Sequence, residues 1–413
     1  MCRWIAYFSE QPILITDVIE RPEHSLLKQI DLHFLPGIQH PAADSGLGSM
    51  NALTNVDGWG LAWYSDVQAK YRTEDRIDPR TGQVRRVELP KLMPTVLKSV
   101  LLPVHDLNLR SVAKTVESSV VFGHMCATVG SPVAVPNCHP FQFGRWSFMH
   151  NGAVGPFSTS QDAIRSLLSP ATRDRIQGTT DTETVAALFF THLEPHGPWY
   201  SSHSLSDIVD ALRRTIMDLI RICTPSKGWH LNDGRTPRTW LSLNLAITDG
   251  ERFVALRYAY PSEREPPSLY WSSVGGSALD RRYKVHPSGG TDIGPVPNEQ
   301  HLPHVVVASE PMTREKADQW HKMQSGQLLM VDKTELAQAA EDNLYHTSHP
   351  VRVKNYWQPD LEELFPAGWT ASAGRSKSRS RAGSMSGSRR KGGREVMSPR
   401  GRAASVSSSG SSV

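Results

Sequence analysis

The chain has 413 residues, a length that can bury a large hydrophobic core and would allow two or three domains. Its net charge of +4 is made up of +9 from residues 371–413 and −5 from residues 1–370. The excess of basic over acidic residues therefore lies in residues 371–413. It gives no reason to expect that the rest of the chain binds nucleic acid. Four cysteines without a C-x-x-C pair do not form a disulfide framework, which favours a reducing compartment.

The first residues, MCRWIAYFSEQPILITDVIERPEH, contain no basic segment that leads into an apolar run. Nowhere does an apolar stretch approach the roughly 18 residues that a membrane-spanning helix requires. We therefore expect a soluble, cytoplasmic protein.

Short apolar or alternating segments predict strands at residues 3–8, 59–64, 119–124, 146–150, 241–248, 252–258, 304–309 and 327–331. Two segments predict helices. In residues 179–193, Thr180 and Glu183 have the spacing of a capping box before an apolar face. Residues 204–223 place their aliphatic side chains on one stripe.

The predicted strands come in hairpin-like pairs with a helical block between them. This order favours antiparallel sheets layered with helices, an α+β fold, over a doubly wound parallel sheet. The charged residues 71–90 predict a protruding hairpin or loop, and residues 262–268 predict a surface connection. Nothing after about residue 310 is long enough to form a second catalytic domain.

Cys2 has the clearest chemical meaning in the chain, because removal of Met1 would leave a thiol and a free α-amine on one carbon. A free thiol titrates near ~8.5 and an α-amine near ~7.7–8.0, so the amine can accept the thiol proton at neutral pH. Such a residue is a nucleophile with its own base, and it needs no histidine.

The segment FGHMCATVGSPVAVPNCHPFQFGRWSFMHNG, residues 122–152, carries the decisive motifs. Together with Cys2, the DGWG at 57–60 and the TDTE at 180–183, it resembles the class II glutamine amidotransferase domain of the N-terminal-nucleophile hydrolases. The resemblance runs from Cys2 to about Val331. It implies an αββα sandwich, in which two antiparallel sheets lie between helical layers.

The resemblance also implies the domain organisation. We expect a catalytic domain over residues 2–331 and a C-terminal extension over residues 332–370 that packs on it. Residues 371–413 are basic and rich in Ser, Arg and Gly, with almost no aromatic or branched apolar side chains. We expect this tail to be disordered, because it cannot bury enough surface to offset the entropy of ordering.

The resemblance implies that Cys2 attacks the γ-carbonyl of a glutamyl group and forms a thioester. The side-chain amide of Asn151 and the backbone N–H of Gly152 would stabilise the oxyanion. A bare Asn-Gly pair is more often a turn, but this one directly follows an apolar strand.

The substrate-binding residues implied by the resemblance are Thr128 for the α-carboxylate, Asp181 for the α-ammonium group, and His139 and His150 in the pocket. Asp181 has a second interpretation as a helix cap. The DGWG segment is assigned a role in shaping the site. No cofactor is expected.

A metal site is the alternative for His124, Cys126, Cys138, His139 and His150, but their spacing fits no usual zinc pattern. We expect no metal. Cys138 and Cys223 are expected to be small core residues.

The chain departs from the family pattern H-x-R-x-x-T-x-G, whose arginine holds the glutamyl α-carboxylate. The run from His124 to Thr128 is one residue shorter and contains no arginine. Either another group holds the carboxylate, or the sequence carries a deletion or a mistaken gene model, or activity has been lost.

No synthase domain accompanies the motifs, so the chain either works with a partner in trans or simply hydrolyses a γ-glutamyl amide. The MCRW start, the DGWGLAWY segment and ASEPM at 308–312 resemble a stand-alone branch. That branch includes the fungal subunit of a glutathione-degrading complex, whose partner is an M20-type metallopeptidase, and a bacterial γ-glutamyl hydrolase of ergothioneine synthesis.

We therefore expect release of glutamate from glutathione in the cytoplasm, with no membrane or nucleic-acid partner. The alternatives are a glutaminase subunit that donates ammonia to a synthase in trans, and a catalytically silent scaffold.

Overall fold

The computed structural model describes residues 2–30, 56–66, 73–77, 81–88, 92–127, 130–155, 157–223, 240–262, 264–273, 275, 281–283, 292–295, 303–313, 320–341 and 352–355. The predicted tail at 371–413 and most of the predicted extension at 332–370 lie outside these residues. Contacts along the chain group residues Met1–Trp369 into one unit and Thr370–Val413 into another.

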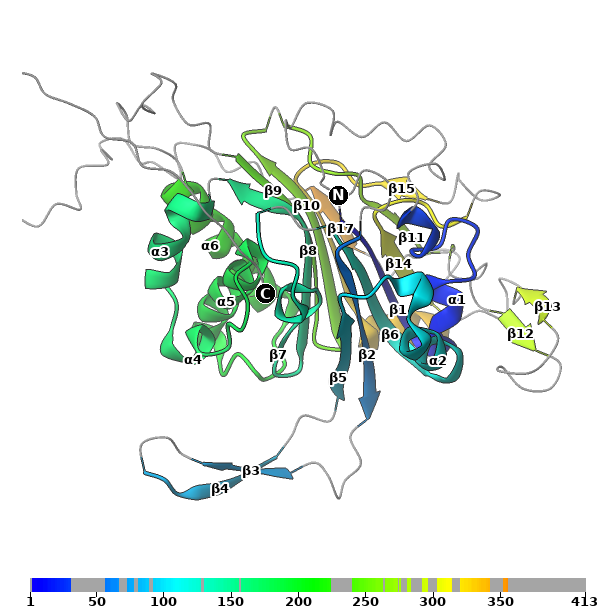
Figure 1. Ribbon diagram of the computed structural model, residues 1–413, viewed down its shortest axis with the longest axis horizontal. Helices are drawn as coiled ribbons and strands as arrows, with labels where there is room; N and C mark the ends of the chain where they lie inside the picture. Colours follow the sequence, from blue (N-terminus) through cyan, green and yellow to red (C-terminus); the bar gives the residue numbers. More distant parts are fainter. Residues whose placement is uncertain are drawn as a thin grey trace, which may run out of the picture. The chain divides into compact units, whose positions relative to one another are not determined.

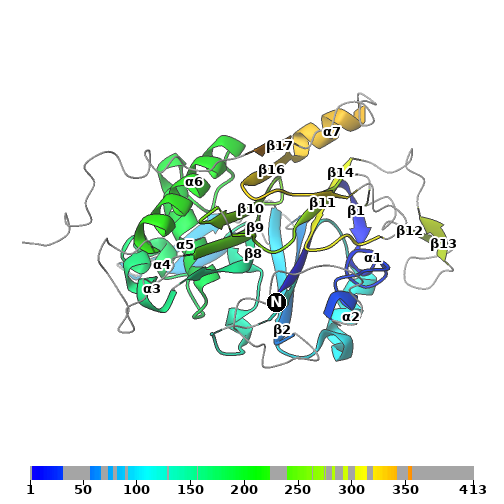
Figure 2. The same ribbon diagram turned by 90° about the horizontal axis from the view of Figure 1, so that it is seen from above.

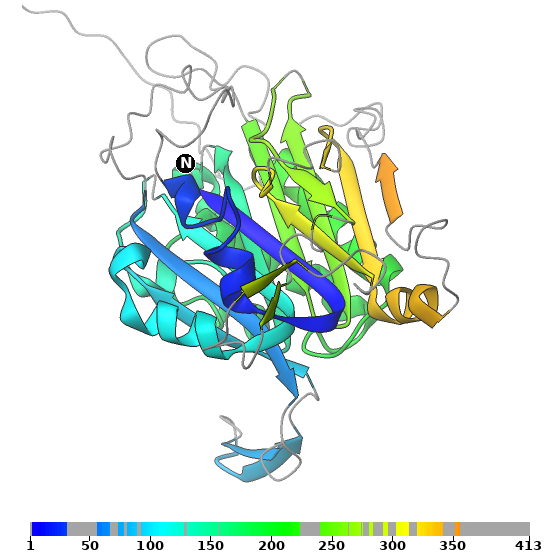
Figure 3. The ribbon, with the colours of Figure 1, turned by 90° about the vertical axis from the view of Figure 1, so that its right-hand side faces the viewer.

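Seven strands form the first sheet, and every pairing in it is antiparallel. In spatial order they are β15 (His321–Lys322), β11 (Tyr270–Ser272), β14 (His304–Ala308), β1 (Arg3–Leu14), β6 (Glu117–Cys126), β2 (Gly58–Asp66) and β5 (Leu92–Ser99). The first strand of the chain is thus an interior strand, with β14 on one side and β6 on the other (Figure 3).

Six strands form the second sheet, which is also antiparallel. Its spatial order is β17 (Arg352–Asn355), β16 (Gln327–Asp332), β10 (Arg252–Tyr260), β9 (Trp240–Thr248), β8 (Trp146–Gly155) and β7 (Phe141–Phe143). Two hairpins stand outside both sheets, β3 (Thr73–Ile77) with β4 (Val84–Glu88) and β12 (Arg281–Tyr283) with β13 (Asp292–Pro295).

The helices cover the outer faces of the sheets (Figures 1 and 2). They are α1 (Ile15–Ile19), α2 (Leu107–Thr115), α3 (Phe157–Ser166), α4 (Pro170–Arg173), α5 (Asp181–Leu193), α6 (Leu205–Cys223) and α7 (Lys333–Glu341). Single turns of 3-10 helix occur at Lys28–Ile30, Pro103–His105, Val135–Asn137 and Glu194–His196. No helix among the described residues is long and apolar enough to cross a membrane.

Three apolar cores hold four layers together, because each strand alternates its side chains between two faces. One core lies between α5, α6 and the second sheet, and it contains Phe148 and Leu243. A second lies between the two sheets and contains Trp4 and Phe253. The third joins the first sheet to α1 and α2. This is the expected αββα sandwich.

The predicted antiparallel arrangement and all eight predicted strands are confirmed, although β1 and β8 run further than the patterns indicate. The charged residues 71–90 contain the β3–β4 hairpin. β5 was not predicted, because Pro94 interrupts its pattern. Proline is tolerated there because β5 is an edge strand.

We predict that Phe253→Ala lowers the free energy of unfolding by about 3–5 kcal/mol, the usual cost of emptying a large aromatic site in a core. Phe253 is fully buried between the sheets, with ring centroids 5.7 Å from both Phe8 and Phe122. Urea denaturation measures the change. Val84→Ala, at a side chain that is 65% exposed, is the control and should alter stability little.

Candidate active site

Strand alternation places Cys2 and Asn151 in the same layer of the molecule. Trp4, two residues after Cys2, belongs to the core between the sheets, and so does Met149, two residues before Asn151. Residues two apart on a strand share a face. Both candidate side chains therefore point between the sheets, one from the residue that precedes β1 and the other from β8.

The thiol of Cys2 is held against the end of β6. Its Sγ lies 3.3 Å from the backbone N–H of Ala127 and 3.5 Å from the carbonyl oxygen of that residue. Burial raises the pKa of the Cys2 thiol, the Ala127 N–H opposes this, and the carboxylate of Asp181 adds to it. The thiol is thus mostly protonated at neutral pH, and it needs a base.

Asn151 offers a donor that the protein itself does not use. The side chain is 2% exposed, and its Nδ2 has no hydrogen-bond partner among the described residues. A buried donor without a partner costs free energy, so it marks either strain or a site that a ligand completes. The Nδ2 of Asn151 is therefore available to a ligand.

Gly152 cannot be replaced without moving the neighbouring strand. A Cβ atom there would collide with the carbonyl oxygen of Ser242 on β9, and it would lie 2.6 Å from the Nε2 of His150. Close backbone approach, more than the turn suggested by the Asn-Gly pair, explains the glycine. The pair lies within a strand, in register with Asn244 and Leu243.

His150 faces the helical layer, opposite to Asn151, and both of its ring nitrogens are engaged. Nε2 donates to the Ser242 carbonyl at 2.9 Å, and Nδ1 accepts from the Thr182 hydroxyl at 2.9 Å. Burial lowers the pKa of His150, which keeps the ring neutral. His150 therefore ties β8 to the first turn of α5.

Asp181 makes a second connection between α5 and β8. Its Oδ2 accepts from the backbone N–H of Val154 at 2.9 Å, and its Oδ1 accepts from that of Thr182 at 2.7 Å. The cap of α5 is Thr180, as the spacing predicts, because its hydroxyl accepts from Glu183 N. Asp181 is thus the first helical residue and remains close enough to raise the Cys2 pKa.

His139 lies behind the nucleophile in a buried cluster with His124 and Cys126. The two imidazole centroids are 4.1 Å apart, and the ligand atoms of all three residues lie within 4.8 Å of one another. Burial lowers the pKa of His124 to about 3 and that of His139 well below its ordinary value. Both rings are therefore neutral and very weak bases.

This cluster is the group in the described part of the chain that could hold a metal ion. His124 donates from Nε2 to the His150 carbonyl at 3.0 Å, and its Nδ1 accepts from the Cys126 thiol at 3.3 Å. The ammonium group of Lys98 is also close enough to lower both histidine pKa values. A neighbouring cation disfavours a metal ion, and the absence of a metal stays a prediction.

The glycines of the DGWG segment allow the 138–139 segment to pack on β2. A Cβ atom on Gly58 would lie 2.7 Å from the Sγ of Cys138, and one on Gly60 would collide with the His139 carbonyl. The segment thus shapes the wall beside Cys126, whose carbonyl accepts from Asp57 N at 2.8 Å. Cys138 and Cys223 are both buried and form no disulfide, as expected of small core residues.

Thr128 lies outside the described residues, whereas the rest of the run in which the family arginine is missing, His124 to Ala127, lies within them. Up to Cys126 the register of β6 is regular, with Arg3 opposite Met125 and Gly58 opposite Cys126. The shortened run therefore leaves the strand itself in place.

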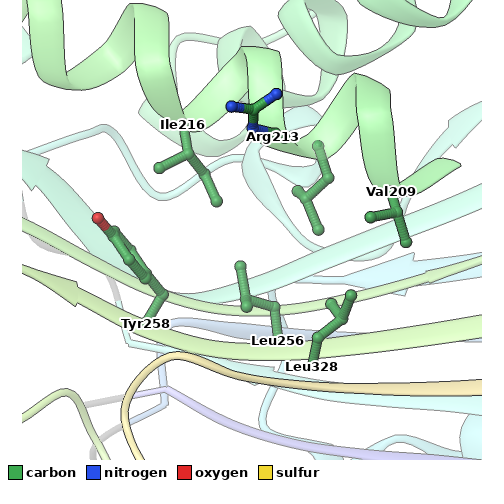
Figure 4. A pocket seen from close by; sticks show the side chains of 7 residues that line it. Val209, Arg213, Ile216, Leu256, Tyr258 and Leu328 are labelled. Carbon is green, nitrogen blue, oxygen red and sulfur yellow. The ribbon is translucent and has the colours of Figure 1, made fainter. Parts of the chain in front are cut away.

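An apolar pocket under α6 is unrelated to this site (Figure 4). It is lined by Val209, Leu212, Arg213, Ile216, Leu256, Tyr258 and Leu328, which come from α6, β10 and β16. It contains neither a nucleophile nor a carboxylate.

Sequence reasoning did not identify two polar residues near the site. Asn244 is an asparagine inside the apolar strand LSLNLAIT, and a buried amide at such a place is a usable signal. Glu310, in the ASEPM segment, is 1% exposed and attracts the guanidinium of Arg3.

The chain is similar to the probable glutamine amidotransferase DUG3 of Saccharomyces cerevisiae, with 27% identity over 365 residues, which are 87% of each chain. This match confirms the resemblance to glutamine amidotransferases drawn from Cys2 and residues 122–152. No protein-family profile matches the chain.

Two solved structures are also similar. The glutamine aminotransferase class-II domain protein of Silicibacter pomeroyi shares 20% identity, covers 86% of this chain and 100% of its own, and has a TM-score of 0.44. A predicted glutamine amidotransferase of Pseudomonas aeruginosa shares 17% identity, covers 80% and 98%, and has a TM-score of 0.38.

We predict that alkylation of Cys2 by iodoacetamide speeds up about tenfold per pH unit between pH 7 and 9, without levelling off. The raised pKa means that the reactive thiolate is a minor form throughout this range. Mass spectrometry of the N-terminal peptide measures the rate, with Cys2→Ser as the unlabelled control. A plateau below pH 8 would contradict the assignment.

Proposed function

We propose that this chain is a γ-glutamyl amide hydrolase of the class II glutamine amidotransferase type, with Cys2 as its nucleophile. The observation that carries the proposal is the shared layer of the Cys2 thiol and the partnerless Nδ2 of Asn151. Acyl transfer requires a nucleophile and an available oxyanion donor, and both lie in this layer. The similarity to DUG3 supports the same class of reaction.

The reaction begins with removal of Met1, which frees the α-amine of Cys2. The amine takes the thiol proton, and Sγ attacks the γ-carbonyl carbon of the substrate. Asn151 Nδ2 and Gly152 N–H stabilise the resulting oxyanion. The carbon–nitrogen bond then breaks, the leaving nitrogen takes the proton from the amine, and a thioester remains, which water hydrolyses to glutamate and free thiol.

The α-amine is the base because the neighbouring histidines are unsuited to the task. His124 has a pKa of about 3, and burial holds the pKa of His139 well below its usual range. Bases that weak accept little thiol proton at neutral pH. The α-amine titrates near ~7.7–8.0, close to the pH at which it must work.

Recognition of the glutamyl group begins with Asp181, whose carboxylate would pair with the α-ammonium group. Each of its oxygens accepts one backbone N–H and can accept another hydrogen bond. Thr128 would contact the α-carboxylate, and His139 would form the wall of the pocket. His150 would act indirectly, because it fixes β8 against α5.

Glutathione is the proposed substrate, and an M20-type metallopeptidase is the proposed partner in the cytoplasm. Glutathione and glutamine present the same γ-glutamyl end, so one pocket accommodates both. The comparison names only the amidotransferase class for the yeast relative. The choice of glutathione rests on the stand-alone motifs in the sequence.

We predict that Asn151→Ala lowers kcat by about 10²–10³, the usual cost of removing one oxyanion donor, with little change in thermal midpoint. If Asn151 served only to stabilise the strand, the variant would have a lower thermal midpoint and an unchanged specific activity. Calorimetry and steady-state kinetics on the same preparation distinguish the two outcomes.

Glutamate release from glutathione and from glutamine, measured with protein from its native host, tests the function. We expect loss of Met1 by intact mass and a higher kcat/KM for glutathione. A preference for glutamine would indicate an ammonia-donating subunit. No turnover of either substrate, together with intact binding of a partner, would establish the scaffold alternative.

A further inference from the structure

Asn244 on β9 stands directly opposite Asn151 on β8. The two residues are Cα partners in the antiparallel register, and they are 0% and 2% exposed. Ala246, two residues further along β9, belongs to the core between the sheets, so Asn244 shares the layer of Asn151. Side chains directly opposite on one face have Cβ atoms about 4.5–5.5 Å apart.

The two amides present complementary groups that the protein leaves unused. Nδ2 of Asn151 is a buried donor without a partner, and Oδ1 of Asn244 is a buried acceptor without a partner, both judged among the described residues. Each unpaired group carries a desolvation cost. Two of them on facing side chains therefore indicate a role beyond packing.

The orientation of Asn244 is fixed by its other end. Nδ2 donates to the carbonyl oxygens of Pro267 at 2.8 Å and Ser268 at 3.3 Å. A rotation that exchanged the amide oxygen and nitrogen would place an acceptor against two acceptors. Oδ1 is therefore held as a fixed acceptor on the face that Asn151 occupies.

The loop that holds Asn244 is linked to Cys2 through Glu310 and Arg3. The Ser268 hydroxyl donates to Oε1 of Glu310 at 2.6 Å, and Glu310 and Arg3 attract one another electrostatically. Arg3 in turn donates from Nη1 to the carbonyl oxygen of Cys2 at 3.1 Å. A chain of buried polar groups thus runs from the asparagine to the main chain of the nucleophile.

We propose that Asn244 is a positioning residue. Its Oδ1 and the Nδ2 of Asn151 are not hydrogen-bonded in the structure, and in the substrate complex, where catalytic hydrogen bonds tighten, Oδ1 accepts one N–H of Asn151 and directs the other N–H at the substrate carbonyl oxygen. The inference rests on the proposed function, since it takes Asn151 to be the oxyanion donor. It also gives the ASEPM segment a role, because Glu310 holds the loop that orients Asn244.

A double-mutant cycle tests this assignment. Asn244→Ala in the wild-type background should lower kcat about tenfold and change KM less than twofold, since the loss is that of one neutral hydrogen bond in the transition state. In the Asn151→Ala background the same substitution should change kcat less than twofold, because the group that it positions is gone.

Equal losses of kcat in both backgrounds would overturn the proposal, because they would show that Asn244 acts independently of Asn151. All rates are normalised to the folded fraction. Thr215→Val is the matched control, since it removes a buried hydroxyl from α6 that donates to Ala211 O at 2.8 Å. It should lower the thermal midpoint and leave kcat per folded molecule unchanged.

A second readout keeps the test separate from the proposed function. The rate of covalent labelling of Cys2 by a glutamine-like diazoketone depends on the oxyanion donor, and it requires no turnover. If wild-type protein hydrolyses no γ-glutamyl amide, the proposed function fails. The same cycle on labelling rates then still decides whether Asn244 acts through Asn151, with equal losses again the contrary result.

Discussion

The main-chain hydrogen bonds on both sides of β1 hold the nucleophile in place. An N-terminal segment ordinarily frays, but β1 pairs with β14 and β6 at once, and an interior strand cannot shift without disrupting both ladders. Cys2 directly precedes the first residue of that strand and contacts Ala127 at the end of β6. Its distance from Asn151 is then set by how the two sheets pack, through side chains such as Trp4 and Phe253.

The layer around Cys2 is polar but carries little charge. The imidazoles of His124 and His139 are kept neutral by burial, and contact with the Cys138 thiol together with burial raises the pKa of Cys126. In such a medium a hydrogen bond to a developing oxyanion is stronger than in water. The formal charges near the nucleophile, on Asp181 and Arg3, are engaged with the main chain.

Short apolar runs predicted antiparallel sheets layered with helices, because strands that face two cores are buried at consecutive residues, and the family resemblance implied the sandwich. The sequence patterns missed β5, where Pro94 breaks the pattern but an edge position makes proline harmless. Motifs placed Cys2 and Asn151 in one site, yet a motif could not show that His150 faces the helices. The 262–268 segment was expected to be a surface connection. Residues 262, 264 and 265 are exposed, but the carbonyl of Pro267 also binds the buried Asn244 and Arg257. Such contacts between distant segments have no local signature in the sequence.

The packing of β2 on the N-C-H-P segment has a consequence for how this sequence can change over evolutionary time. Gly58 and Gly60 leave room for Cys138 and for the His139 carbonyl, so the two stretches form an interlocking pair although some eighty residues separate them. A side chain added at either glycine must push the histidine segment away from the nucleophile. A substitution at position 58 or 60 is thus tolerated only if the 138–139 segment moves with it.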